Sequence, residues 1–201
     1  RDLFEEQVEI ILKAWNKDEF SYQGKHYNIP ANIVHRGRML KKITLVPRPL
    51  SRPVDCWQPI TGGSQRGMDF MAKNSIKAVF AGGTAPGGKA EFAANHWLDT
   101  LQRSGRQVEL GDDLALVLQI HMADTEEKAI NEAEPFQQEQ IKALAPLGRF
   151  PNLSHEQIEA TFDPDLAPLA GLPTVRDAVK DGSWLCGPPK HIADKISELL
   201  D

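Results

Sequence analysis

The sequence predicts an α/β fold in which parallel strands form a sheet and helices cover it. Between residues 54 and 144, apolar runs of strand length alternate with amphipathic runs of helix length. Glycine pairs follow two of the apolar runs, at 62–63 and 82–83, where a strand would turn into a helix. Because parallel strands need crossovers that are usually helices, such units in series favour an open doubly wound sheet or part of a (β/α)8 barrel.

The first 53 residues precede this regular part of the sequence. Apolar residues spaced by three and four predict an amphipathic helix over 2–16, with acidic residues in its first turn. Aromatic residues on either side of Gly24 predict a β-hairpin with a glycine turn. Residues 31–53 are basic and irregular, with a short strand at 43–46 and prolines that favour an extended chain.

From residue 54 onward, strands and helices should follow one another. Pro135 lies inside one expected helix and should kink it or split it in two. Residues 145–182 are rich in proline and irregular, and Pro188-Pro189 should open the last helix. The expected strands are 54–60, 76–81, 114–122 and 184–187, and the expected helices are 67–74, 89–104, 124–144, 154–161, 173–180 and the segment from Pro189.

Composition excludes several classes of protein. Hydrophobic residues make up 41% of the 201 residues, as in ordinary globular domains. The net charge of -5 argues against a nucleic-acid or anionic-membrane partner, and no apolar run approaches the roughly 20 residues of a membrane span. The two cysteines, Cys56 and Cys186, lie in apolar runs and should be reduced core residues of a cytoplasmic protein. The chain opens on Arg1 and both ends read as helical, so we expect a segment of a longer protein.

Residues 54–72, VDCWQPITGGSQRGMDFMA, carry the clearest chemical signal. The turn 61–64 joins an apolar strand to a helix whose first N–H groups and positive dipole end would face an anion. Glycines at 62–63 would let a phosphate approach the backbone, and Ser64 could donate its hydroxyl. The residues leave a second interpretation open, in which Ser64 is only the helix cap and Arg66 is solvated. No GxGxxG, P-loop or metal-ligand spacing appears.

Three segments in order resemble the luciferase-like flavin-dependent monooxygenases, a (β/α)8-barrel family. They are LFEEQVEIILKAW with FSYQGKHYNIP, then VPRPLSRPVDCWQPITGGS, and finally WLCGPPKHIADKI. In the last segment Pro188 replaces the usual Thr and Ile192 the usual Val. The resemblance implies that residues 1–201 form one partial barrel domain of the TIM-barrel type, with strands five to seven at 54–60, 76–81 and 114–122. Strands one to four would precede Arg1 and the last would follow Asp201, so this part alone should be inactive.

The resemblance also implies a chemistry for the full-length protein. Reduced FMN and molecular oxygen would act on a small organic substrate, with the reduced flavin supplied by a separate flavin reductase, and the enzyme would be a homodimer. The loop after strand five would hold the flavin phosphate, and the loop after strand six would approach the ring or ribityl chain, or be a plain turn. The implied cofactor-binding residues are Gly62, Gly63, Ser64, Arg66, Gly67, Gly82 and Gly83.

Catalytic residues stay unassigned, because the family's polar constellation comes mostly from strands one to four. By its position His121 would be the best general-base candidate, although a histidine bonded to a neighbouring loop explains it more simply. Trp57 is expected in the core, and Gln58 could face either the flavin or a polar barrel layer. The alternatives are hydride transfer with F420 on the same fold, a non-catalytic flavin-binding paralogue, and an unrelated α/β protein that binds a sugar phosphate.

Overall fold

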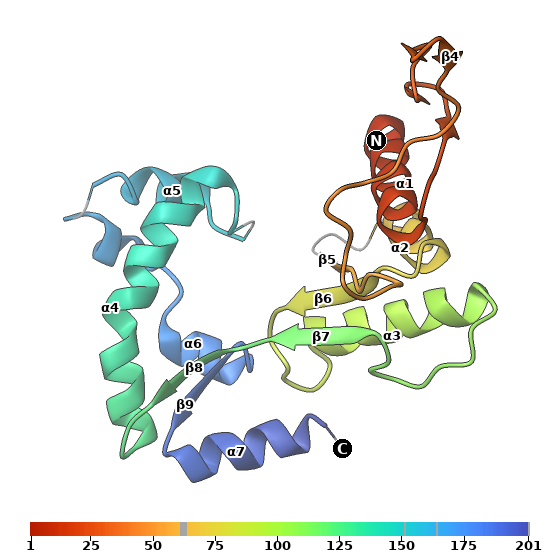
Figure 1. Cartoon of the computed structure of the whole chain (residues 1–201). Helices are drawn as coiled ribbons and strands as arrows, with labels where there is room; N and C mark the ends of the chain where they lie inside the picture. The colour runs from red at the N-terminus through yellow and green to blue at the C-terminus, as the bar shows by residue number, and fades with distance from the viewer. Residues whose placement is uncertain (61–63, 151, 164, 201) are drawn as a thin grey trace. The chain divides into compact units, whose positions relative to one another are not determined.

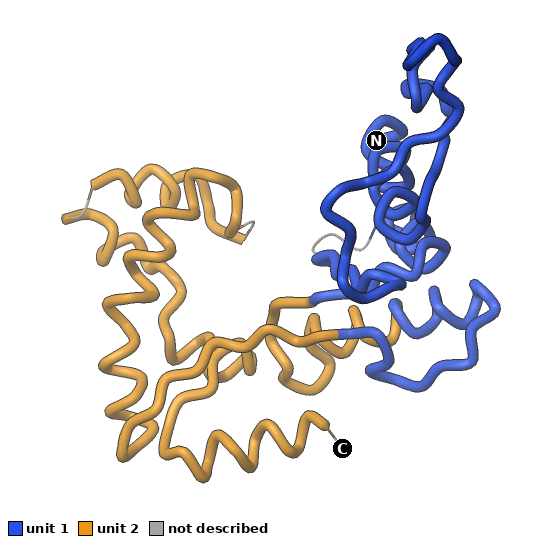
Figure 2. The backbone as a smooth tube through the Cα atoms, in the orientation of Figure 1, with its two compact units in different colours: residues 1–79, 97–114 blue, residues 80–96, 115–201 orange. Residues whose placement is uncertain are grey.

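The computed structural model describes residues 1–60, 64–150, 152–163 and 165–200 (Figure 1). The chain divides into two compact units (Figure 2). Unit 1 comprises Arg1–Val79 and Trp97–Leu114, and unit 2 comprises Phe80–His96 and Ala115–Asp201. Each unit is described on its own below.

Unit 1 begins with the predicted helix and hairpin. Helix α1 spans Asp2–Asn16, and the two-residue strands β1 (Tyr22–Gln23) and β2 (Asn28–Ile29) pair antiparallel. The buried carboxylate of Glu6 accepts backbone N–H bonds from His26 and Tyr27, at 3.1 and 2.8 Å. These bonds fix the hairpin turn against α1, so both predictions are confirmed.

Residues 31–53 differ from the prediction in two ways. The expected strand at 43–46 is reduced to one bridge, between Ile43 and Phe20. A second hairpin, β3 (Val34–His35) with β4 (Arg38–Met39), forms instead. Its loop residues, Arg36 and Gly37, both have positive φ, 50° and 73°, as the tightest hairpin turns require. This turn is not predicted from the sequence, because only one of its two central residues is glycine.

The next part of the chain follows the predicted alternation of strand and helix. Strand β5 pairs parallel with β6, with Trp57 opposite Lys77, and the sheet order is β5-β6-β7. The predicted parallel arrangement is therefore confirmed for β5 and β6. The elements are β5 (Trp57–Pro59), α2 (Gln65–Lys73), β6 (Lys77–Ala81), α3 (Lys89–Arg103) and β7 (Leu114–Val117).

The core of unit 1 is formed by side chains of α2, β6 and α3. Met71, Trp97 and Leu101 are each no more than 1% exposed, and Ala78 of β6 is fully buried. The indole Nε1 of Trp97 donates to the backbone oxygen of Asp113, 3.2 Å away, so the buried ring keeps a hydrogen-bond partner. This packing fixes α2, whose first turn belongs to the predicted phosphate site.

The strand predicted at 114–122 is two strands in the structure. β7 ends at Val117, and β8 (Gln119–Met122) pairs parallel with β9 (Trp184–Gly187) in a second sheet. The change of partner interrupts the strand at Leu118. The described strands thus form separate small sheets rather than a closed barrel, and the partial-barrel prediction stays unconfirmed at this level.

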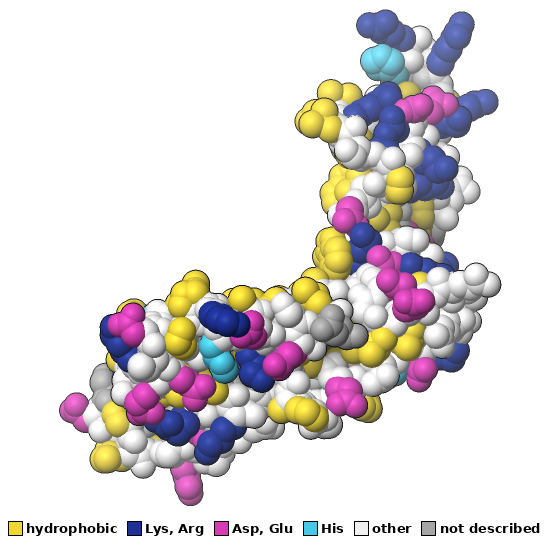
Figure 3. Space-filling model, turned by 90° about the horizontal axis from the view of Figure 1, so that it is seen from below, with side chains coloured by type: hydrophobic (Ala, Val, Ile, Leu, Met, Phe, Trp, Pro, Cys, Tyr) yellow, Lys and Arg dark blue, Asp and Glu magenta, His cyan; other side chains and the backbone are white. Residues whose placement is uncertain are grey.

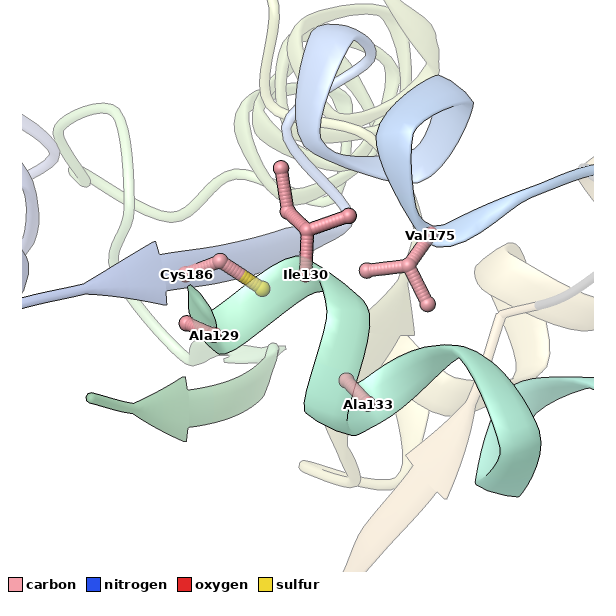
Figure 4. Close-up of a cluster of buried hydrophobic side chains, with 5 residues drawn as sticks. All are labelled: Ala129, Ile130, Ala133, Val175 and Cys186. Atoms are coloured by element: carbon pink, nitrogen blue, oxygen red, sulfur yellow. The ribbon is translucent and has the colours of Figure 1, made fainter. Parts of the chain in front are cut away.

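Helix α4 (Glu126–Leu144) organises unit 2. Thr125 caps it by accepting the N–H of Lys128. The helix continues through Pro135, so of the two expected outcomes, a kink or a split, the split is wrong. Ala129, Ile130 and Ala133 of α4 pack against Val175 and Cys186 (Figure 4). The remaining elements are the 3₁₀ turns Ala145–Leu147 and Ala167–Ala170, α5 (His155–Ala160), α6 (Val175–Lys180) and α7 (Pro189–Glu198).

The two faces of β8 have different surroundings. Gln119 and His121 hydrogen-bond to Gln140 and Glu132 of α4, so this face is covered. On the alternate face, Ile120 and Met122 are 44% and 58% exposed. Hydrophobic side chains are also visible among the charged ones in the surface view (Figure 3). The uncovered face of β8 is therefore apolar, as expected for a strand that is to be buried on both sides.

Candidate functional site

Ser64 stands at the N-cap of α2 with its hydroxyl free for contacts other than capping. Its φ and ψ, −63° and 109°, are those of a cap residue, but its side chain makes no capping bond. Instead, Oγ accepts a hydrogen bond from Nη1 of Arg1, 3.3 Å away. The simple interpretation as a side-chain cap therefore does not describe this serine.

The side chain of Arg1 lies in the space that a side chain at position 67 would occupy. A Cβ atom on Gly67 would lie 2.6 Å from Nη2 of Arg1, so the guanidinium passes directly over this glycine in the first turn of α2. Nε of Arg1 also donates to Glu5, at 3.0 Å. Arg1 was not predicted as a site residue, because its contact with Ser64 joins positions 63 residues apart. The cation of Arg1 and the hydroxyl of Ser64 thus lie together at the N-terminus of α2.

Arg66 turns toward α1. Its Nη2 lies 2.5 Å from Oδ1 of Asp2 and 2.9 Å from Oε2 of Glu5. The hydrogen bond from Arg66 is the main cause that lowers the pKa of each carboxyl, and the two carboxylates raise the pKa of the guanidinium. Arg66 could bind a phosphate only by leaving these partners, so its predicted role stays a prediction.

Replacing Arg66 by glutamine should raise the pKa of Asp2 and Glu5 toward their ordinary values, 3.8 and 4.5. A lowered pKa in the folded state stabilises the protein above the unfolded value, and this contribution disappears as the pH falls through the folded value. Arg66→Gln should therefore lower the stability at neutral pH, and the loss of stability on lowering the pH should become smaller. NMR titration of the side-chain carboxyls measures both values.

A matched control for this substitution is Arg176→Gln, which removes the corresponding partner of Glu127 in unit 2. It should raise the pKa of Glu127 and leave Asp2 and Glu5 unchanged. If Asp2 and Glu5 titrated identically with and without Arg66, the ion pairs described above would not exist in solution.

The other glycines predicted to bind the cofactor lie in two different places. Gly62 and Gly63 lie outside the described residues. Gly82 and Gly83 belong to unit 2, whereas Ser64, Arg66 and Gly67 belong to unit 1. The structure thus brings Ser64, Arg66 and Gly67 to one helix start, and Gly82 and Gly83 to the loop after β6.

Gly83 is required by packing. A Cβ there would lie 2.2 Å from the backbone oxygen of Asp181, whereas a Cβ on Gly82 would meet the ring of Phe80 at 2.8 Å. The same loop is held by the N–H of Ala85, which donates to the oxygen of Asp181 at 3.0 Å. This close approach is sufficient reason for glycine at 83, and the cofactor role of Gly82 and Gly83 stays a prediction.

Three further expectations concern single side chains. His121 is bound through Nε2 to Oε2 of Glu132 at 3.0 Å, a partner on α4 rather than a loop. Trp57, expected in the core, is 45% exposed, which contradicts that expectation. Its ring lies 5.0 Å from Nζ of Lys77, because both residues occupy the same uncovered face of neighbouring strands. Gln58 is half-buried.

Neither thiol has the environment of a nucleophile. Cys186 is buried and Cys56 is half-buried, and both are free. Burial raises the pKa of both thiols, so they stay protonated at neutral pH. Among the described side chains, no cluster of three His, Cys, Asp or Glu could hold a metal ion. Within the same part of the chain, no helix has the length and apolar character needed to cross a membrane.

The family model for luciferase-like monooxygenases matches residues 1–201, and the chain therefore belongs to this family. This membership confirms the resemblance inferred from the sequence, and it excludes the alternative of an unrelated sugar-phosphate-binding protein. No curated protein sequence matches the chain.

Solved structures share the fold at low identity. Coenzyme F420-dependent tetrahydromethanopterin reductase from Methanopyrus kandleri has a TM-score of 0.62 and 16% identity, over 99% of this chain and 54% of that one. The oxygenating constituent of 3,6-diketocamphane monooxygenase from Pseudomonas putida, solved with FMN, has a TM-score of 0.57 and 18% identity, over 99% and 53%. Monooxygenase RslO1 from Streptomyces bottropensis has a TM-score of 0.52 and 16% identity, over 96% and 57%. The chain thus spans about half the length of these structures.

Proposed function

We propose that the whole protein is a flavin-dependent monooxygenase that uses reduced FMN and molecular oxygen on a small organic substrate. The observation that carries the proposal is the match to the luciferase-like monooxygenase family over all 201 residues. A similar fold in a monooxygenase constituent solved with FMN supports the choice of cofactor.

The start of α2 is the proposed phosphate site. Ser64 supplies a hydroxyl that is not used for capping, and the first N–H groups of α2 point out of the helix end. The guanidinium of Arg1 adds a positive charge beside them, in the space that Gly67 leaves open. These donors fit a phosphate group, and Gly62 and Gly63 stay candidates from the sequence alone.

In this proposal the flavin and the protein residues have different roles. When bound, reduced FMN supplies the electrons that activate oxygen. The described residues would hold and orient the cofactor: Ser64 and Arg1 would donate to its phosphate, and the buried packing of α2 would keep Ser64 in place. We assign proton transfer to none of the described side chains, since His121 is engaged with Glu132.

Replacing Ser64 by alanine should weaken FMN binding by about 1 kcal/mol, the contribution of one neutral hydrogen bond, or about fivefold in Kd. Quenching of FMN fluorescence on titration with the full-length protein measures this change. Ser197→Ala, an exposed serine on α7, is the matched control and should leave the affinity unchanged. An unaltered FMN affinity in Ser64→Ala would contradict a role of Ser64 in phosphate binding.

Hydride transfer with F420 is the second candidate. Structures of an F420-dependent reductase and of an F420-dependent secondary alcohol dehydrogenase share the fold, with TM-scores of 0.62 and 0.60. F420 also carries a phosphate, so the donors at the start of α2 would suit it as well. A non-catalytic flavin-binding paralogue would instead bind FMN and consume no oxygen.

The partners follow from the same proposal. A separate NAD(P)H-dependent reductase would supply reduced flavin, and the description of one structural neighbour as an oxygenating constituent supports a system of separate parts. The homodimer is likewise part of the proposal. Size-exclusion chromatography with light scattering on the full-length protein would test it directly.

A further inference from the structure

Each of the two carboxylates that hold Arg66 has a second cation beside it. Oδ1 of Asp2 lies 2.5 Å from Nη2 of Arg66, and its Oδ2 lies 3.8 Å from Nζ of Lys25. Oε2 of Glu5 lies 2.9 Å from the same nitrogen of Arg66, and its Oε1 lies 3.0 Å from Nε of Arg1. The departure of Arg66 would therefore leave both carboxylates paired with a cation.

The ion pairs of Arg66 are of a kind that exchanges at little cost. The side chains of Arg66 and Asp2 are 56% and 58% exposed, and that of Glu5 is 18% exposed. Exposed ion pairs contribute little to stability, because water screens the charges and holding two long side chains together costs entropy. In the described part of the chain, the side chain of Arg66 makes no hydrogen bond other than those to these two carboxylates.

The guanidinium of Arg66 lies close to the proposed phosphate donors. One carboxylate, that of Glu5, contacts both Arg66 and Arg1. Nη1 of Arg1 donates in turn to the hydroxyl of Ser64, 3.3 Å away. Arg66 is also the second residue of α2, so its backbone already belongs to the helix start. A change of side-chain rotamer, without movement of the backbone, can therefore bring its guanidinium to a phosphate at this helix end.

We propose that Arg66 is a mobile phosphate ligand that changes partners when the cofactor binds. The inference rests on the proposed phosphate site at the start of α2. In the free protein Arg66 pairs with Asp2 and Glu5. In the loaded protein it binds the phosphate, while Lys25 keeps Asp2 paired and Arg1 keeps Glu5 paired. The contact of a guanidinium with a phosphate is a charge-assisted hydrogen bond and replaces exposed ion pairs, so the exchange is favourable.

Two of these side chains then act on the phosphate through Arg66 rather than by contact. Asp2 is a positioning residue that competes with the phosphate for the guanidinium. Lys25 is a positioning residue of the opposite effect, since it compensates the charge of Asp2 once Arg66 has left. Both roles predict changes in phosphate affinity from side chains that do not touch the ligand.

Titration of the full-length protein with FMN and with riboflavin measures what the phosphate contributes. Riboflavin lacks only the phosphate, so the ratio of the two dissociation constants isolates the phosphate contacts. Quenching of flavin fluorescence follows both titrations. We expect FMN to bind more tightly than riboflavin. Arg66→Gln should weaken FMN binding about fivefold and leave riboflavin binding unchanged.

Asp2→Asn distinguishes an exchange of partners from simple repulsion. It removes a competitor for Arg66, so FMN should bind about threefold more tightly. In an Arg66→Gln background the same substitution should change nothing, because no arginine remains to be released. A carboxylate that only repels the phosphate would act equally in both backgrounds. Asp18→Asn, which removes the partner of Arg48 and Arg52 beyond the C-terminal end of α1, is the matched control and should leave both affinities unchanged.

Lys25→Gln tests the compensating cation. It leaves Asp2 with Arg66 alone, so FMN should bind about threefold more weakly, with riboflavin unchanged. Combination with Asp2→Asn should abolish this loss, and Lys25→Arg should restore the wild-type affinity. Lys17→Gln is the matched control, since Lys17 is exposed in the same unit and pairs with no carboxylate among the described residues.

The results separate this inference from the proposed function. If Ser64→Ala weakened FMN binding but Arg66→Gln did not, the inference would be overturned and the phosphate site would stand. Additive effects of Asp2→Asn and Arg66→Gln would overturn it in the same way. Equal binding of FMN and riboflavin by the wild-type protein would instead remove the phosphate site, and the inference with it. Arg66, Asp2 and Lys25 are exposed, so their variants should fold, and circular dichroism checks this.

Discussion

Replacing Trp97 by alanine should lower the free energy of unfolding by about 3–5 kcal/mol. The side chain is 1% exposed and is among the largest that are fully buried in the described structure. Its removal leaves a cavity between α2, β6 and α3, and it also leaves the backbone oxygen of Asp113 without the indole N–H. Urea denaturation followed by circular dichroism measures the loss.

Phe92→Ala is the control for Trp97→Ala. Phe92 is also an aromatic residue of α3, but it is 69% exposed. Its removal should change the free energy of unfolding by no more than about 0.5 kcal/mol. Equal effects of the two substitutions would contradict the packing of α3 in unit 1. A large loss for Trp97 alone would confirm that its side chain is packed in the core of unit 1.

Replacing Gly83 by alanine should destabilise unit 2 by about 3 kcal/mol. The new Cβ would lie 2.2 Å from the backbone oxygen of Asp181, and this oxygen is held in place by the N–H of Ala85. The backbone must therefore shift, which is the costly case of overpacking. Gly82→Ala would meet side-chain atoms of Phe80 rather than backbone, so it should cost less, about 1 kcal/mol.

The comparison of Gly82 with Gly83 separates packing from cofactor binding. Urea denaturation without flavin should show the loss for Gly83→Ala, because packing does not depend on a ligand. If Gly83→Ala instead kept full stability and lost FMN affinity, this glycine would serve the cofactor and the close approach to Asp181 would be incidental.

Local sequence signals predicted most of the elements. The helix at Asp2–Asn16 and the hairpin around Gly24 follow from spacing and turn chemistry within a few residues. The cap of α4 is equally local, because the hydroxyl of Thr125 contacts an N–H only three residues away. Such interactions are local, so the sequence alone specifies them.

Other features depended on partners that are distant in the sequence. The strand at 114–122 is uninterrupted in its apolar pattern, yet it divides at Leu118 because its second half pairs with β9, more than 60 residues later. Trp57 is exposed because no described element covers its face of β5. Hydrophobicity predicts that a strand will be buried, but not which of its faces the described chain covers.

In the candidate site, too, local features were predictable and contacts between distant residues were not. Ser64 at a helix start was predictable from the glycine turn and the change of period that follows it. The contact of Arg1 with Ser64 and the ion pairs of Arg66 with Asp2 and Glu5 were not, since they join α1 to α2 across more than 60 residues. The family resemblance implied Arg66 as a phosphate ligand, whereas the structure shows carboxylates that compete for it.

Equilibrium titration of the full-length protein with FMN and with F420, followed by cofactor fluorescence, tests the central proposal most directly. The proposed phosphate site at the start of α2 predicts saturable binding of FMN, weakened about fivefold by Ser64→Ala. Binding of F420 without binding of FMN would contradict the proposed monooxygenase and would assign the protein to hydride transfer.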